Sequence, residues 1–258
     1  MISKEELREI GKRRNYNLGQ AEKDYFQDII LFILYQEFGK ELVFKGGTAL
    51  SKCYGLDRFS QDLDFTLHSK KDLKPILTSG LERFFIPFEL KEKEYEDGKK
   101  IILRIEGPLY TGNRGSLCRI ELDISLRERV FIDPKRKRIG RFLPEIPSFT
   151  VIVMSNEEIL AEKVRSILTR DMARDIYDIN FLLDLDTEIN PILIEKKLQY
   201  YEMKFDPNSF YKALKRKRDI WSKELKPIVK EVPPFSEVLG KIKMRFEEVY
   251  GGTINKIR

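Results

Sequence analysis

Two aspartates separated by one residue, Asp62 and Asp64, indicate a specific chemical function more clearly than any other residues of this 258-residue sequence. The apolar residues Leu63 and Phe65 alternate with them, which predicts a β-strand at one edge of a small sheet, with both carboxylates on the same face. Two such carboxylates repel each other unless a cation lies between them, and Mg²⁺ is a cation that prefers oxygen ligands. The pair therefore predicts a magnesium site suited to in-line displacement at a phosphate. Taken alone, the pair also fits a solvated edge strand that forms salt bridges with Arg58.

A glycine turn precedes the aspartates, between a predicted strand over 41–45 and a predicted helix over 48–54. Glycine lets the backbone approach a phosphate closely, and the start of a helix favours negative charge. The turn is not a Walker loop, because the pattern G-x-x-x-x-G-K-[ST] is absent. With the polar residues that follow it, this turn predicts binding of nucleotide phosphates. The residues concerned are Gly46, Gly47, Thr48, Arg58 and Ser60.

A third acidic residue is expected on a neighbouring strand. The segment 119–124 alternates polar and apolar side chains, which places Glu121 and Asp123 on one face and their apolar neighbours in the core. Either acid completes a set of three carboxylates with the first two aspartates as a metal ligand, and Asp123 is the favoured one. The alternative for the unused acid is a half-exposed strand position, where Arg119 forms a salt bridge with Glu121.

The second half of the sequence adds charged residues at helical spacing. Lys163 lies within a predicted helix, where its ammonium group is able to reach a triphosphate as a point charge. Asp175 and Asp178, three residues apart, share a helix face. Arg174 and Asp178 are four residues apart, so an intrahelical salt bridge is an alternative explanation for this run. Each of these features by itself is more often structural than functional.

Together these motifs resemble the AbiEii-type, or MenT-type, nucleotidyltransferase toxins of bacterial and archaeal toxin–antitoxin systems. The resemblance rests on GGT at 46–48, R-x-S-x-D-x-D at 58–64, E-K at 162–163 and R-D-x-x-D at 174–178. It implies a polymerase-beta-like nucleotidyltransferase fold with a helical C-terminal half. It also implies transfer of a nucleotide from an NTP, in some relatives onto the 3′ end of tRNA, and a cognate antitoxin.

The resemblance implies a role for each motif. The GGT segment cradles phosphates, Asp62 and Asp64 bind magnesium, Lys163 contacts the triphosphate, and the segment 174–178 completes the site. The predicted catalytic residues are therefore Asp62, Asp64, Lys163, Asp175 and Asp178, and either of the last two fits the essential helix aspartate. Besides the GGT segment, the nucleotide is expected to contact Arg58, Ser60, Lys163 and Arg174. Glu121 and Asp123 both stay open as the third metal ligand.

We therefore expect a magnesium-dependent nucleotidyltransferase that acts on an RNA 3′ hydroxyl, with tRNA as the acceptor. The chain is then expected to be the toxin of a type IV-like toxin–antitoxin system, with an antitoxin protein as a partner. One alternative is transfer of the nucleotide to a hydroxyl of a protein or small molecule. Another is a non-catalytic module that binds RNA or a protein partner.

The strands and helices that position these residues divide the sequence near residue 154. Residues 1–154 predict an α/β nucleotidyltransferase domain, and residues 155–258 predict a helical domain that completes the site, which makes the fold α+β. Further strands are predicted over 88–95, 100–106, 116–126 and 149–154, with a hairpin at Asp97-Gly98 and a basic, turn-rich segment over 127–140. Helices are predicted over about 156–170, 174–184, 188–202, 207–222 and 234–250. Capping boxes predict helix starts at Ser3, with Glu6, and at Ser155, with Glu158.

Composition narrows the class of protein. No run approaches the ~18 consecutive apolar residues of a membrane span, and the N-terminal residues lack the apolar core of a signal peptide. Only Cys53 and Cys118 are present, which favours the reducing cytoplasm over a disulfide framework. Residues 190–258 hold 16 lysines and arginines against 9 aspartates and glutamates. This surplus predicts a basic surface on the helical domain and a polyanionic partner.

Overall fold

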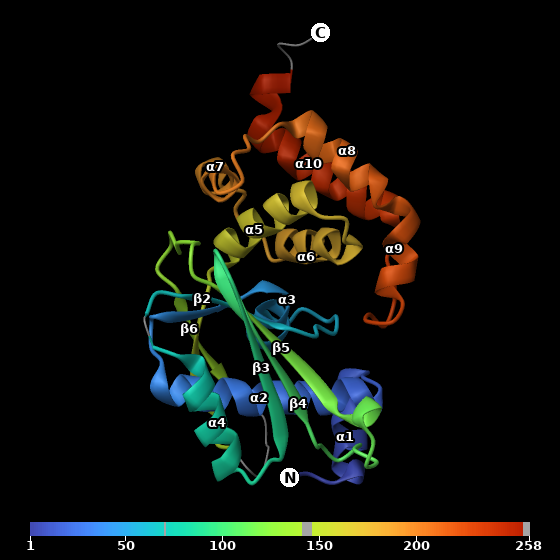
Figure 1. The fold of residues 1–258 in the computed structure, drawn as a ribbon. Helices are drawn as coiled ribbons and strands as arrows, with labels where there is room; N and C mark the ends of the chain where they lie inside the picture. Colours follow the sequence, from blue (N-terminus) through green and yellow to red (C-terminus); the bar gives the residue numbers. More distant parts are fainter. Residues whose placement is uncertain (70, 141–145, 255–258) are drawn as a thin grey trace. The chain divides into compact units, whose positions relative to one another are not determined.

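The chain forms two compact units in a computed structural model that describes residues 1–69, 71–140 and 146–254. Residues 70, 141–145 and 255–258 of the predicted domains lie outside the described residues. The sheet unit comprises Met1–Gly55, Phe59–Val130 and Pro134–Met154, and the helical unit comprises Leu56–Arg58, Phe131–Asp133 and Ser155–Arg258. The predicted α+β fold, a mixed sheet with a helical second half, is confirmed (Figure 1).

Among the described residues, seven strands form one sheet in the order β3-β4-β5-β2-β1-β7-β6. Their bounds are β1 (Leu42–Lys45), β2 (Leu63–Leu67), β3 (Phe88–Tyr95), β4 (Gly98–Ile105), β5 (Cys118–Ser125), β6 (Lys135–Ile139) and β7 (Phe149–Val153). β2 runs parallel to β5 and β1 runs parallel to β7, whereas the other neighbouring pairs are antiparallel. The predicted hairpin at Asp97-Gly98 joins β3 to β4, with Tyr95 opposite Gly98.

The aspartate strand β2 lies inside the sheet, so its prediction as an edge strand is wrong. β1 flanks it on one side and β5 on the other, and β2 is hydrogen-bonded to both. The sequence of a five-residue strand does not show which strands will flank it in the sheet, and β5 comes from a segment far along the chain. The interior position matters because both flanking strands can bring side chains next to the aspartates.

The basic segment 127–140 contains a strand that its turn-rich composition did not predict. Lys135–Ile139 forms β6, which pairs antiparallel with β7 at the edge of the sheet. Its four consecutive basic residues are unusual for a strand, but lysine and arginine are well suited to an edge. Charge on an edge strand discourages pairing with the strands of other chains.

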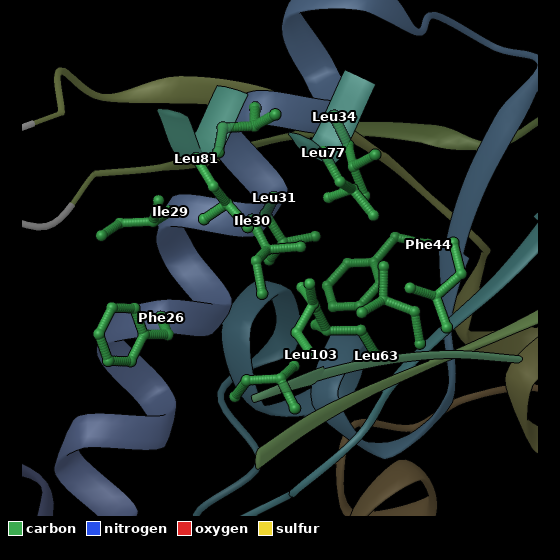
Figure 2. Packing of buried hydrophobic residues seen from close by; sticks show 14 of the residues in the cluster. Phe26, Ile29, Ile30, Leu31, Leu34, Phe44, Leu63, Leu77, Leu81 and Leu103 are labelled. Carbon is green, nitrogen blue, oxygen red and sulfur yellow. The ribbon is translucent and has the colours of Figure 1, made fainter. Parts of the chain in front are cut away.

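Helix α2 (Leu18–Glu37) supplies most of the helical side of the core in the sheet unit. Its apolar side chains meet α4 (Leu73–Arg83) and the sheet, as Figure 2 shows for Ile30 and Leu34 against Leu77, Phe44 and Leu63. These side chains are fully buried, which stabilises the sheet that carries the aspartates. The preceding helix α1 (Lys4–Arg14) begins at the predicted capping box of Ser3 and Glu6.

The helical unit contains six described helices, which begin after the predicted cap Ser155. Their bounds are α5 (Asn156–Thr169), α6 (Ala173–Asp184), α7 (Pro191–Gln199), α8 (Pro207–Arg216), α9 (Arg218–Leu225) and α10 (Phe235–Ile254). The single helix predicted over 207–222 is therefore wrong, because it is split at Lys217. The Lys217 side chain turns inward and its ammonium group donates a hydrogen bond to the carbonyl oxygen of Ile167. No glycine or proline lies at this break, so the helical periodicity of the apolar residues predicts one continuous helix.

Cys53 and Cys118 are both free thiols. Burial raises the pKa of each thiol to about 12, so both are protonated at neutral pH and act as small apolar side chains. In the part of the chain that the structure describes, no helix has the length and apolar character needed to cross a membrane.

Candidate active site

Four charged residues form a row across four neighbouring strands of the sheet unit. Lys45 of β1 is paired in register with Asp64 of β2. Asp64 is paired in turn with Asp123 of β5, and Asp123 with Lys100 of β4. Residues that lie directly opposite each other in a sheet point to the same face and interact. This charged row therefore places the carboxylates of Asp64 and Asp123 side by side, with a lysine beyond each of them.

Asp62 immediately precedes β2, one residue before its first paired position. Asp62 and Asp64 are half-buried, whereas Leu63 and Phe65 are fully buried in the core, so the predicted alternation of polar and apolar positions is confirmed. The hydroxyl of Thr48 donates a hydrogen bond to the carbonyl oxygen of Asp62. This bond ties the glycine segment to the start of the aspartate strand.

The glycine segment begins a helix directly, without the predicted turn. Helix α3 (Gly46–Ala49) follows β1 at once and continues into a π-helical turn over Leu50–Tyr54. Gly46 has a φ angle of +73°, and a Cβ atom there would lie 2.2 Å from Oδ2 of Asp64. Glycine adopts positive φ readily and has no side chain to collide. The close approach of the backbone to the Asp64 carboxylate therefore requires glycine at position 46.

The two candidates for the third acid share one lysine as an ion-pair partner. Lys100 Nζ lies 3.0 Å from Glu121 Oε2 and 3.2 Å from Asp123 Oδ1. Burial lowers the pKa of Lys100, but the hydrogen bond to Glu121 and the charge of Asp123 outweigh this effect and raise it. Arg119 Nη1 also lies 2.6 Å from Glu121 Oε1, as the alternative for that acid predicted. The side chain of Glu121 is 18% exposed and that of Asp123 is 42% exposed, so Asp123 is the more accessible acid.

The helical unit holds a second set of predicted site residues, which form an ion-pair cluster with Arg170 around two buried aspartates. Its members are Arg58, Lys163, Arg170, Asp175 and Asp178. Lys163 Nζ lies 2.9 Å from Asp175 Oδ1 and 2.6 Å from Asp178 Oδ2. Arg58 donates two hydrogen bonds to the Asp178 carboxylate, at 2.5 and 2.7 Å. Arg170 donates two to the Asp175 carboxylate, at 2.8 and 2.9 Å, and both aspartates are fully buried.

These partners keep both buried aspartates ionised. Burial alone would raise the pKa of Asp175, but the charge of Lys163 and the hydrogen bond from Arg170 outweigh it, so the pKa lies well below the ordinary 3.8. For Asp178, burial is likewise outweighed by the charges of Arg58 and Lys163, and the pKa is lowered. Opposite charges in good hydrogen-bonding geometry therefore offset the cost of burying these carboxylates in the helical unit.

The last two predicted contacts of the nucleotide, Ser60 and Arg174, are half-buried. The side-chain amide of Gln27 donates hydrogen bonds to the carbonyl oxygens of Ser60 and Gln61, at 3.0 and 2.9 Å. Gln27 is buried on α2, so it holds the segment that leads into Asp62. Sequence patterns single out neither Gln27 nor Lys100, since their contacts arise only when the helix and strands pack.

Comparison with known proteins assigns the chain to a family. Residues 30–248 match the family model described as "Nucleotidyl transferase AbiEii toxin, Type IV TA system". The chain belongs to this family. The AbiEii resemblance is thus confirmed, and this AbiEii protein is a nucleotidyltransferase. A search among curated protein sequences gives no significant match.

Solved structures share the fold of this AbiEii chain. One is MenT4, the nucleotidyltransferase toxin Rv2826c of Mycobacterium tuberculosis H37Rv, with a TM-score of 0.67 and 19% identity over 95% of this chain and 89% of that chain. Another is JHP933 of Helicobacter pylori, with a TM-score of 0.62 and 19% identity over 92% of this chain and 94% of that chain. At this level of identity the likeness establishes the fold alone.

Nucleotidyltransferases of this kind generally use a divalent metal ion, and the charged row fits one. Asp64 and Asp123 are adjacent, half-exposed carboxylates on one face of the sheet. Within the described residues, no three or more acidic, histidine or cysteine side chains are grouped to hold a metal by themselves. Magnesium commonly takes only one or two protein carboxylates and completes its shell with water and substrate phosphates. The two aspartates match that mode of binding.

Replacing Gly46 by alanine is expected to lower nucleotide transfer by about 100-fold, since displacement of a reacting group by about 1 Å has an effect of that size. The new methyl group would collide with Asp64 Oδ2 and push the carboxylate out of the charged row. Gly55 provides a matched control, because it also has positive φ, +88°, but a Cβ atom added there would have no neighbouring atom within 4 Å. Transfer rates and thermal unfolding of both alanine variants are the measurements. Equal losses of activity would show that backbone strain, and not the collision, is responsible.

Proposed function

We propose that this chain transfers a nucleotide from an NTP to the 3′ hydroxyl of an RNA, with tRNA as the acceptor and Mg²⁺ as the cofactor. The observation that carries the proposal is the pairing of Asp64 with Asp123 on one face of the sheet. In the same proposal the chain is the toxin of a type IV-like system and is neutralised by an antitoxin, in line with the family description. We propose that both the transfer reaction and its inhibition by the antitoxin take place in the cytoplasm.

Asp64 and Asp123 are the carboxylates that would hold magnesium together, and Asp62, directly before β2, stays a proposed ligand. The ion, when bound, neutralises phosphate charge and favours attack by a hydroxyl. The backbone around Gly46 and Thr48 lies beside these aspartates and is proposed to meet the phosphates of the nucleotide. Lys100 of the charged row, whose ammonium group pairs with Asp123, limits repulsion between the carboxylates before substrate arrives.

We propose Lys163 as the cation that contacts the triphosphate, as the family resemblance implies. Its ammonium group is held by Asp175 and Asp178 together, so we propose that these aspartates act as positioning residues. Asp178 also binds Arg58, which makes it the stronger candidate for the essential helix aspartate. Arg174 and Ser60 remain proposed nucleotide contacts at half-buried positions.

RNA is the proposed acceptor because the helical part of the chain is basic. Residues 190–258 carry a surplus of seven positive charges, which favours a phosphate-rich partner. Transfer from NTP to a nucleic acid also needs mainly positioning and charge neutralisation, which the charged row and the basic surface supply.

Incubation with each of the four NTPs, labelled at the α-phosphate, tests this proposal. Magnesium is present throughout, and purified total tRNA, total cell protein and a metabolite extract are offered as separate acceptors. We expect label on the tRNA 3′ end, loss of labelling with a chelator, and recovery with added magnesium. Label only on protein or on a small molecule would overturn the RNA proposal, and absence of label under every NTP would overturn the transfer reaction.

Two isosteric variants test the choice of the third acid. Asp123→Asn is expected to lower transfer by about 100-fold or more, an effect typical of removing one preorganised charge from an active site. Glu121→Gln keeps the acid beside Asp64 and is expected to lower transfer less than about tenfold. Steady-state rates at several magnesium concentrations separate weaker metal binding from slower chemistry. A larger loss for Glu121→Gln would reverse the assignment.

A further inference from the structure

A basic groove lies along the helical unit, between α8 and α10, which run side by side (Figure 1). Its volume is about 700 Å³, and it is entirely built from this one unit. The lining residues are Asn208, Tyr211, Lys212, Lys215, Arg216, Leu239, Lys243 and Glu247. None of them belongs to the charged row or the ion-pair cluster. We call this feature the α8–α10 groove.

The groove follows from the helical repeat of its two walls. Positions 208, 211, 212, 215 and 216 recur at the spacing of one face of a helix, and positions 239, 243 and 247 do the same on α10. The opposite face of α8 is apolar: Phe210 is fully buried, with its ring 4.8 Å from the ring of Phe246 of α10. Packing of these apolar faces therefore sets the two polar faces beside each other.

Positive charge dominates the α8–α10 groove. Lys212, Lys215 and Arg216 are exposed, and none forms a salt bridge with another described residue. Lys243 Nζ lies 3.6 Å from Glu247 Oε1, which offsets only one of the four cations. Like charges three and four residues apart on a helix repel each other and reduce its stability. A bound polyanion would remove this repulsion.

We propose that the α8–α10 groove binds the phosphodiester backbone of the RNA acceptor. A protein partner would need an apolar centre to its interface, yet Leu239 is the only aliphatic side chain among the lining residues. Phosphates are bound by lysine, arginine, asparagine and tyrosine side chains without regard to base sequence, and these types make up most of the lining. The inference rests on the proposed function for the identity of the RNA, and on the groove itself for the mode of binding.

The test measures RNA binding without catalysis. The triple variant Lys212→Gln/Lys215→Gln/Arg216→Gln is made in an Asp64→Asn chain, and binding of end-labelled tRNA is followed by fluorescence anisotropy without NTP. Glutamine keeps helix propensity close to that of lysine and arginine. We expect Kd to rise at least about tenfold, and the slope of log K against log salt to fall by about 2 to 3. The matched control is Lys223→Gln/Lys226→Gln/Lys230→Gln, which removes three exposed charges outside the groove.

Each outcome decides the inference. Weaker binding only in the groove variant supports it, whereas equal weakening in the control would show a dependence on net charge and overturn it. Poly-L-glutamate is the second probe, and a groove variant that loses this polymer but still binds tRNA would point to an acidic protein and also overturn it. A chain that binds tRNA through the groove but labels no RNA would contradict the proposed function alone. Circular dichroism of both triple variants checks that the helices remain folded.

Discussion

Replacing Asp64 by asparagine is expected to lower nucleotide transfer by about 100- to 1000-fold, the range found when one preorganised electrostatic group is removed from an active site. Asparagine has the shape of aspartate but carries no charge, so the charged row would lose half of its carboxylate pair. The asparagine side chain would still fit beside Gly46, and the pairing of β2 with β5 would not change. Initial rates with saturating NTP and tRNA measure the effect.

The control for this variant is Asp97→Asn, in the exposed turn between β3 and β4. Asp97 forms a salt bridge with Arg127 at the surface, 2.7 Å between Oδ2 and Nη1, and has no proposed part in catalysis. Its activity is expected to match the unmodified chain. If Asp64→Asn retained full activity while remaining folded, the charged row would not be the catalytic site. If it abolished activity with normal circular dichroism, a chain that only binds RNA or a partner would be excluded.

Replacing Asp178 by alanine is expected to lower the free energy of unfolding of the helical unit by about 3–5 kcal/mol, the cost of breaking a buried ion pair by removing one partner. Asp178 is fully buried and binds both Arg58 and Lys163. Without the Asp178 carboxylate, the guanidinium group of Arg58 would stay buried in the helical unit without this partner. Trp221 is the sole tryptophan of the chain and is buried in α9, so its fluorescence during denaturant unfolding reports on the helical unit.

Asp184→Ala on the same helix is the matched control. Asp184 pairs with Lys241 at the surface and its side chain is 54% exposed, so the expected change is at most about 1 kcal/mol. Equal changes for Asp178→Ala and Asp184→Ala would contradict the importance of the buried cluster. Transfer activity is measured beside stability, because a positioning role for Asp178 predicts lower activity even at temperatures where the variant remains folded.

Acid provides a further readout for the same cluster. The folded chain lowers the pKa of Asp175 and Asp178 below their ordinary value of 3.8, whereas the unfolded chain does not. Their stabilising effect is therefore complete above that ordinary value and is lost as the pH falls toward the lowered pKa values. Removal of Asp178 should make the stability of the helical unit less sensitive to acid. An unchanged acid profile would mean that the pKa of Asp178 is the same in the folded and the unfolded chain.

The sequence by itself determined the features that depend on neighbouring residues. Alternation around Asp62 and Asp64 predicted the buried positions of Leu63 and Phe65, because side chains of a strand alternate between its faces. The capping residue Ser155 predicted the start of α5, because the N–H groups of a helix start are satisfied by side chains nearby in sequence. The same local motifs, taken together, pointed to the AbiEii family.

Only the tertiary structure decided which distant residues meet. It placed Asp123, and not Glu121, directly opposite Asp64, because strand register is set by hydrogen bonds between segments far apart in sequence. It also brought Arg58 to Asp178 and buried Lys163 between two aspartates, whereas the sequence offered an intrahelical salt bridge between Arg174 and Asp178 as the alternative. The need for glycine at position 46 became specific only when the Asp64 carboxylate lay against it. Local geometry follows from adjacent residues, whereas register, strand order and burial depend on how the whole chain packs.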